Sequence, residues 1–179
     1  MLVMGVCNPA GEQNTYNGLY FTGGELEELV SSGNLVGRPV KAEHKGGALG
    51  HIVSSFVDDR GKLNCVMKLN DSVEGAIAAG LVRDGIASEL SLGYSVDVAH
   101  SEQGQQLQAG KKQVLEVSLV RKGARDACYV TAFEDEGQPT RFTRREGQAK
   151  QLVSVTEQAS ETANNTAADT WATFDMFNI

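Results

Sequence analysis

The sequence predicts an α+β domain in which helices flank a mostly antiparallel sheet. Several runs alternate apolar and polar residues with period two, as strands with one buried face do. Two other segments combine helix-capping residues with apolar residues at helical spacing. The chain has 179 residues, which is enough for one domain with a substantial core and a tail.

Residues 1–21 predict an opening strand, a loop rich in turn-forming residues, and a second short strand at Gly18 to Phe21. A helix follows. Thr22 and Glu25 have the spacing of a capping box, in which each side chain accepts a hydrogen bond from a first-turn N–H group. Gly33 ends this helix. The apolar stripe of this helix consists of Leu26, Leu29 and Val30.

Two strand-like runs then meet at the polar segment Asp58 to Gly61, which predicts a hairpin because glycine tolerates the positive φ of a tight turn. Asn70 or Asp71 is the expected N-cap of a second helix that ends at Gly85. In the second arm of the hairpin, the residues of one face are Leu63, Cys65, Met67 and Leu69. In the second helix, the residues at helical spacing are Val73, Ile77 and Leu81.

The segment Ile86 to Asp97 predicts a strand with two unlike faces, and Ser91 lies on the less apolar one. The polar residues 100–112 predict a hairpin tip or mobile loop. A strand resumes at Gln113, and Glu116 lies opposite its more strongly apolar face. The segment 121–127, RKGARDA, predicts a turn, and Cys128 to Phe133 predicts one more short strand.

Composition excludes several classes of protein. The net charge is −7 with 16 Lys and Arg residues, so no basic surface for nucleic acid or an anionic membrane is expected. The chain has neither a signal-peptide pattern nor an apolar run of membrane-spanning length. We expect a soluble, intracellular protein. Its three widely spaced cysteines predict buried, reduced thiols rather than a disulfide framework.

The composition changes after Phe133. Residues 136–170 contain too few apolar residues to offset the entropy of ordering them, which predicts disorder. Residues 171–179 differ because they hold a dense aromatic cluster. An apolar terminus of this kind either folds back onto its domain or binds another protein.

Ser91 could act as a nucleophile if a base and an orienting acceptor lay nearby. Of the three histidines, His44 is the one at the start of a strand, and Glu116 could orient it. The RKGAR turn would then supply backbone N–H groups and Arg125 for an oxyanion. From spacing alone, the alternative is a surface histidine, a strand serine and a solvated carboxylate. The GxSxG elbow is absent, and the order His44, Ser91, Glu116 matches none of the best-known serine hydrolases.

Other assignments of the polar residues are weaker. Ser88 lies on the apolar face of its strand and is expected to be structural, and the same is expected of Ser95. His51 lies within a strand. A zinc site of His44, His51 and Cys65 lacks the usual ligand spacing, and no metal or other cofactor is expected.

Three segments resemble viral maturation proteases. PVKAEHKGGALGHI with DDRGKL is similar to the histidine segment of the tailed-phage prohead proteases and of the herpesvirus maturational proteases (assemblins). LSLGYS is similar to their nucleophile strand, and LEVSLVRKGARDA to the phage segment E-V-S-L-V with its following turn. The segments occur in the family's order and cover roughly residues 35–130.

The resemblance implies a barrel-like, herpesvirus-protease-like fold, with residues 1–135 as the protease domain. It makes Ser91 the nucleophile, His44 the general base and Glu116 the third member. Herpesvirus enzymes have a histidine at that third position, so the glutamate matches the phage branch. Arg125 and Ala124 match the oxyanion turn, where Ala124 replaces an arginine and would contribute its backbone N–H.

The resemblance also implies a serine endopeptidase of capsid maturation that acts inside the assembling procapsid. The host compartment would be the bacterial cytoplasm for a phage and the nucleus for a herpesvirus-like virus. Scaffold and major capsid protein are the implied partners, and a homodimer is implied by analogy. Ala159 and Ser160 match a self-cleavage site, although Ala-Ser also occurs by chance in such linkers. Residues 171–179 would bind capsid protein. The alternative is a non-catalytic scaffold or capsid-assembly protein on a degenerate protease fold.

Overall fold

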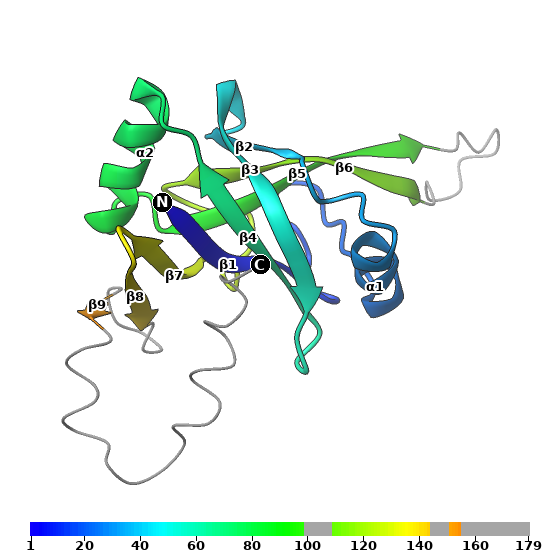
Figure 1. Ribbon diagram of the computed structural model, residues 1–179. Helices are drawn as coiled ribbons and strands as arrows, with labels where there is room; N and C mark the ends of the chain where they lie inside the picture. Colours follow the sequence, from blue (N-terminus) through cyan, green and yellow to red (C-terminus); the bar gives the residue numbers. More distant parts are fainter. Residues whose placement is uncertain (99–108, 144–150, 155–179) are drawn as a thin grey trace, which may run out of the picture.

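The computed structural model describes residues 1–98, 109–143 and 151–154. The loop predicted around His100, the Ala159–Ser160 junction and the apolar segment 171–179 lie outside the described residues. Within the described ranges the chain forms two helices and a single nine-stranded sheet (Figure 1). The α+β fold class predicted from the sequence is therefore confirmed.

The elements follow one another along the chain with these bounds. The strands are β1 (Leu2–Pro9), β2 (Pro39–Ala42), β3 (Lys45–Val57), β4 (Lys62–Leu69), β5 (Glu89–Val98), β6 (Ala109–Val120), β7 (Val130–Asp135), β8 (Gln138–Thr143) and β9 (Gln151–Ser154). The helices are α1 (Gly23–Ser31) and α2 (Val73–Arg83). No helix in these ranges is both long enough and apolar enough to cross a membrane.

The strand order is β5-β6-β2-β3-β4-β1-β7-β8-β9. All neighbouring strands pair antiparallel except β2 and β6, which are parallel. One bridge between Glu89 and Tyr129 joins β5 to the segment before β7, and Leu90 N–H donates to the Cys128 carbonyl beside it. The sheet therefore curls toward a barrel, but among the residues that the structure describes no continuous ladder closes it.

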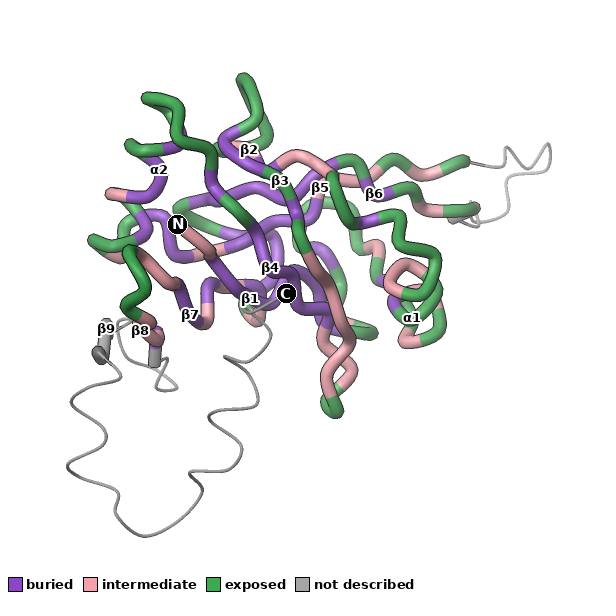
Figure 2. The backbone as a smooth tube through the Cα atoms, viewed as in Figure 1, coloured by how far each residue is buried: buried purple, intermediate pink, exposed green. Residues whose placement is uncertain are grey.

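The apolar faces of the central strands form the core, which Figure 2 shows as purple tube in the middle of the sheet. Two local predictions are confirmed. The capping box of Thr22 and Glu25 begins α1, and the Asp58 to Gly61 turn joins β3 to β4, with Gly61 at φ 70°. The predicted face of β4 is almost fully buried: Leu63, Cys65, Met67 and Leu69.

Two local predictions are wrong. Gly18 to Phe21 form no strand, because the asparagines before them organise turns: Gly18 N–H donates to the Asn14 carbonyl and Leu19 N–H to the Asn17 side chain. The N-cap of α2 is Ser72, not Asn70 or Asp71, since its hydroxyl accepts from Gly75 N–H.

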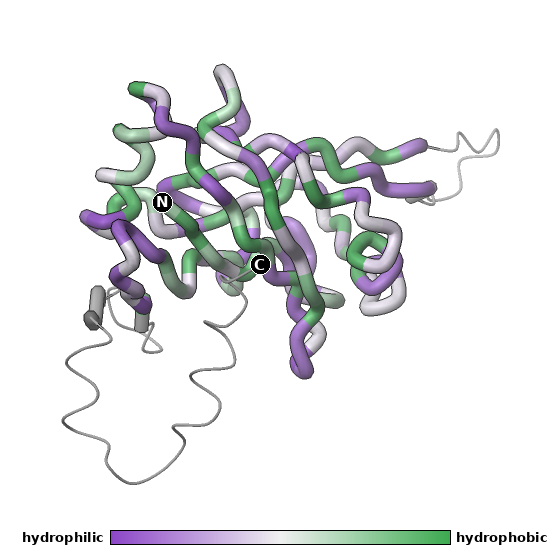
Figure 3. Tube along the Cα trace, viewed as in Figure 1, coloured by the Kyte–Doolittle hydropathy of each residue, from purple (hydrophilic) through white to green (hydrophobic). Residues whose placement is uncertain are grey.

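The apolar stripe predicted for α2 faces outward. Val73, Ile77 and Leu81 are exposed, whereas the helix packs through Gly75, Ala78, Ala79 and Val82. An added Cβ on Gly75 would lie 2.1 Å from the Asn70 carbonyl oxygen, so glycine at this position lets the first turn of the helix pack against the segment that precedes it. Hydrophobic stretches of α2 in Figure 3 accordingly coincide with exposed stretches in Figure 2.

Ordered structure also begins and ends at different points from those predicted. β6 starts at Ala109, inside the segment expected to be a loop, and β8 and β9 continue the sheet beyond residue 135. The expected disorder of residues 136–170 is therefore wrong for these strands. Phe142 explains the position of β8, because it is buried and its ring lies 5.7 Å from that of Phe133.

Candidate active site

Ser91 lies in β5, opposite Ser118 of β6. Its neighbours Leu90 and Leu92 are buried in the core, and because side chains alternate along a strand, Ser91 points to the opposite face. The predicted orientation of this strand is confirmed, although β5 begins at Glu89 rather than Ile86. The apolar face thus anchors the strand and leaves the hydroxyl on the outer side of the sheet.

His44 lies in a two-residue turn between β2 and β3, since Ala42 pairs with Lys45. Both turn residues have positive φ, 47° at Glu43 and 60° at His44. Two-residue hairpins with this twist favour glycine or asparagine at such positions, so the turn holds both residues in a backbone conformation that is uncommon outside glycine. Strained residues of this kind cluster at functional sites.

The parallel pairing of β2 with β6 brings this turn to Glu116. Val40 lies beside Val117 and Ala42 beside Leu119, and Glu43 N–H donates to the Leu119 carbonyl. The turn is therefore bound to the strand that carries Glu116. This pairing joins segments that are far apart in the sequence: His44 and Glu116, which are in contact, are separated by 72 positions.

The three predicted residues meet in one hydrogen-bonded series. His44 Nε2 lies 2.9 Å from Ser91 Oγ, and His44 Nδ1 lies 2.6 Å from Glu116 Oε1. The exposed fraction of the side chain is 45% for His44 and 8% for Glu116, and Ser91 is buried. A substrate can therefore approach from the His44 side, while the carboxylate is shielded from water.

The arrangement determines which ring nitrogen can accept a proton. A carboxylate only accepts hydrogen bonds, so His44 Nδ1 donates to Glu116 and Nε2 is left to accept from the Ser91 hydroxyl. This is the relation of nucleophile, base and orienting acid that acyl transfer requires. The geometry is fit for nucleophilic chemistry at Ser91.

Gly93 makes room for the carboxylate. It pairs with Glu116 across the two strands, and a Cβ added at Gly93 would lie 1.9 Å from Glu116 Oε1. Any larger residue would occupy the space that the carboxylate needs in order to reach His44. The free space beside this glycine therefore serves the acid within the site, not an incoming substrate.

Comparison with known proteins gives a structural likeness. No family model and no curated protein matches the sequence. A solved structure of KSHV protease with a hexapeptide phosphonate inhibitor is similar at 14% identity, covering 75% of this chain and 65% of its own, with a TM-score of 0.48. In this match, the aligned part of this chain spans less than two thirds of the length of the solved protease chain.

Two further structures of the protease of Kaposi's sarcoma-associated herpesvirus, both with allosteric inhibitors, are also similar. One is 16% identical, covers 73% of this chain and 76% of its own, and has a TM-score of 0.44. The other is 14% identical, covers 98% and 90%, and has a TM-score of 0.41. These sequence identities and TM-scores are too low to assign roles to individual residues. The roles of the site residues are therefore argued from the geometry of this chain.

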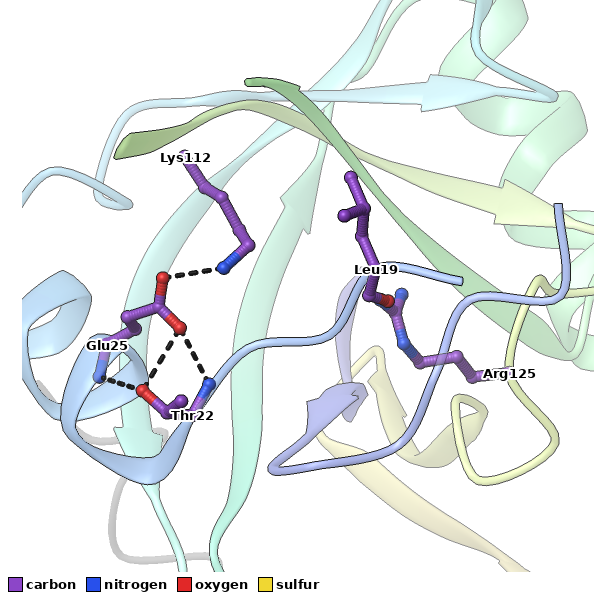
Figure 4. Close-up of polar contacts among 5 residues, drawn as sticks. All are labelled: Leu19, Thr22, Glu25, Lys112 and Arg125. Carbon is purple, nitrogen blue, oxygen red and sulfur yellow. Dashed lines mark hydrogen bonds and ion pairs between the residues drawn. The ribbon is translucent and has the colours of Figure 1, made fainter. Parts of the chain in front are cut away.

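The proposed oxyanion residues lie in the turn between β6 and β7. The buried Arg125 donates from Nε to the Glu12 carbonyl at 2.9 Å and from one terminal nitrogen to the Leu19 carbonyl at 3.1 Å. Figure 4 shows Arg125 beside Leu19. These contacts hold the loop before α1, and they commit the guanidinium to carbonyl groups. The Ala124 carbonyl accepts from Thr15.

The same turn passes beside Glu89 and Leu90, the two residues of β5 that precede Ser91. A Cβ on Gly123 would lie 2.9 Å from the Leu90 carbonyl oxygen, and Gly123 N–H donates to the Glu89 carboxylate at 2.5 Å. At its start, Arg121 N–H donates to Glu43 Oε1 at 2.9 Å. Two carboxylates thus accept hydrogen bonds from the backbone of the turn. One belongs to Glu89 of β5 and the other to Glu43, the residue before His44.

The remaining candidates lie away from this series. Ser88 is buried before β5, Ser95 is exposed further along β5, and His51 is exposed in β3. Within the described ranges, no group of three or more His, Cys, Asp or Glu side chains is placed to hold a metal ion. Sequence reasoning did not identify Ser118, whose hydroxyl contacts both Glu116 and His44; its place two residues after Glu116 was the available signal.

Proposed function

We propose that this protein is a serine endopeptidase of viral capsid maturation that forms an acyl-enzyme at Ser91. The observation that carries the proposal is the pair of contacts made by one imidazole, 2.9 Å from Nε2 to Ser91 Oγ and 2.6 Å from Nδ1 to Glu116 Oε1. Each atom lies where proton transfer during acyl transfer requires it.

In the proposed reaction, Ser91 Oγ attacks the peptide carbonyl carbon and its proton passes to His44 Nε2. The C–N bond then breaks as His44 returns the proton to the leaving amine, which leaves an ester on Ser91. Water attacks this ester, His44 takes a proton from the water, and Ser91 regains its hydrogen as the carboxylic acid departs. Glu116 stabilises the imidazolium in both halves.

The turn beside Ser91 is the proposed source of oxyanion donors. We assign this role to the backbone N–H groups of Ala124 and Arg125, because the Arg125 guanidinium already donates to two loop carbonyls. Preorganised backbone donors need no rearrangement when charge develops on the substrate oxygen. The carboxylates of Glu43 and Glu89 hold the turn in place.

The capsid context comes from the three segments that resemble prohead proteases and assemblins. The proposed substrates are scaffold, capsid protein and the protein's own tail at Ala159–Ser160, with residues 171–179 binding capsid protein and the chain working as a homodimer inside the procapsid. The phage branch is favoured by Glu116, where herpesvirus enzymes have histidine.

A fluorophosphonate ester tests the chemistry without a known peptide substrate, since it phosphonylates an activated serine and releases fluoride. We expect one adduct on Ser91 by intact mass and peptide mapping, and none on S91A. H44A should label at least about 10³-fold more slowly and E116A about 10²-fold more slowly. S95A, which changes an exposed serine of the same strand, is the control and should label normally. An unlabelled wild type, or labelling elsewhere, would overturn the proposal.

The proposed self-cleavage has its own test. The purified 179-residue chain and its S91A form are incubated in separate samples, and their intact masses are followed over time. Loss of residues 160–179 from the wild type alone supports cleavage at Ala159–Ser160. Equal stability of both tails, with no cutting of scaffold, would favour the non-catalytic assembly protein.

A further inference from the structure

Ser118 is a fully buried hydroxyl beside the proposed active site. It lies on β6 opposite Ser91 and two residues after Glu116, so both side chains project from the same face of the strand. Its exposed fraction is 0%. A buried hydroxyl requires hydrogen-bond partners, and here those partners belong to the other members of the site.

The hydroxyl makes two bonds with opposite roles. It donates to Glu116 Oε2 at 2.5 Å and accepts from the backbone N–H of His44 at 3.0 Å. Glu116 thus has one oxygen bound by the His44 ring and the other by Ser118. One serine links the acid to the main chain of the base.

The Ser118 hydroxyl affects two features of the site, the orientation of the Glu116 carboxylate and the backbone of His44. The free space at Gly93 allows the Glu116 carboxylate to lie where it does. It does not determine the rotation of the carboxylate about its terminal side-chain bond. Among the described residues, the bond from Ser118 holds the second oxygen, Oε2, and this turns Oε1 toward His44 Nδ1. The bond to His44 N–H also supports a backbone with φ of 60°, a conformation that non-glycine residues rarely adopt.

We propose that Ser118 is a positioning residue for the reaction at Ser91, acting through both Glu116 and the backbone of His44. This inference rests on the proposed peptidase function. Removing the hydroxyl leaves the nucleophile and both of its partners in the chain, but it frees the carboxylate and the histidine turn to move. Misplacement of catalytic groups by about 1 Å lowers rates by up to about 10²-fold.

The test is a double-mutant cycle on the rate of phosphonylation by a fluorophosphonate ester. S118A should label about 10- to 100-fold more slowly than wild type. In an E116A background, the same change should slow the reaction by a smaller factor, because the contact with Glu116 is already absent and the contact with His44 N–H alone is lost. S118C keeps a side chain at this position, although the thiol is larger than the hydroxyl and a weaker donor, and it should also be slow. S95A is the matched serine control.

The outcomes distinguish failure of the proposed function from failure of this inference. A wild type that does not label overturns the proposed function and this inference together. A wild type that labels, with S118A and S118C equally fast, overturns the inference alone. An S118A loss of the same factor in both backgrounds indicates a merely structural serine and also overturns it. Unfolding midpoints are recorded for every variant, and S118C provides the decision if S118A does not fold.

Discussion

Gly93 shows how a single missing methyl group can decide the geometry of a site. Its register partner is Glu116, and the carboxylate occupies the volume where a Cβ would stand. The glycine is needed for space and not for backbone freedom, since its φ is not in the left-handed region.

We therefore predict that G93A displaces the Glu116 carboxylate and lowers the rate of fluorophosphonate labelling by about 10-fold or more. G47A is the matched control, because Gly47 also lies in a strand and has no atom within 4 Å of an added Cβ. Equal labelling rates for the two variants would show that the carboxylate accommodates the methyl group.

The cysteines lead to a second prediction at the residue scale. Cys7, Cys65 and Cys128 are free and buried, as the sequence predicted. Burial raises the pKa of the Cys128 thiol to about 12. Burial, followed by the neighbouring Cys65, raises the pKa of the Cys7 thiol as well. The thiolate is the reactive form.

A thiol reagent such as dithionitrobenzoate should consequently modify none of the three cysteines in the native protein at neutral pH, and all three after unfolding. Absorbance of the released thiolate counts the groups directly. Rapid reaction of a thiol in the native protein would contradict the burial of all three cysteines.

At the scale of elements, α2 is a helix whose stripe of large apolar residues faces outward. Its packing face consists of small residues and Val82, and at Gly75 the Asn70 carbonyl leaves no room for a side chain. Helical spacing in the sequence marks an apolar stripe, but it does not show which of two stripes fits the available gap.

We predict that V82A lowers the free energy of unfolding by about 1–3 kcal/mol, since it creates a cavity at a fully buried position. I77Q should change it by less than about 0.5 kcal/mol, because Ile77 is exposed on the same helix. Urea unfolding measures both. A larger loss for I77Q than for V82A would mean that the outward stripe is covered in solution.

At the scale of the whole molecule, one ion pair ties α1 to β6. Lys112 Nζ lies 2.6 Å from Glu25 Oε1 and 5.0 Å from the centre of the Phe21 ring. Figure 4 shows the same Glu25 carboxylate bound to Thr22 of the capping box. Burial by itself would raise the pKa of Glu25, but the hydrogen bonds from Lys112 and Thr22 outweigh it and lower the pKa below its ordinary value of 4.5.

Because the pKa of Glu25 is lower in the folded state than in the unfolded chain, the direction in which stability changes with pH is fixed. Above pH 4.5 the stabilisation by the Glu25 carboxylate is fully present; as the pH falls through the lowered pKa, the unfolded chain takes up the proton first and stability is lost. E25Q should therefore flatten the acid side of a stability curve measured by urea unfolding. E27Q, an exposed glutamate of the same helix, should keep the wild-type slope. Parallel curves for wild type and E25Q would refute the assignment.

Sequence alone determined what depends on neighbours along the chain. The capping box of α1, the hairpin at Asp58 to Gly61 and the unlike faces around Ser91 all follow from local spacing, and the structure contains each of them. The three candidates Ser91, His44 and Glu116 were named from residue type together with a resemblance in segment order. Spacing by itself left a surface histidine and a solvated carboxylate as the alternative.

Only the tertiary structure decided how those residues meet. The parallel pairing of β2 with β6 has no local signature, and it carries the turn of His44 to Glu116. That turn contains neither glycine nor asparagine, so its positive φ values could not be anticipated from composition. Free space at Gly93 and the two bonds of Ser118 depend on atoms of other strands. Local sequence sets backbone preference and face, whereas the contacts between distant strands set which side chains share a site.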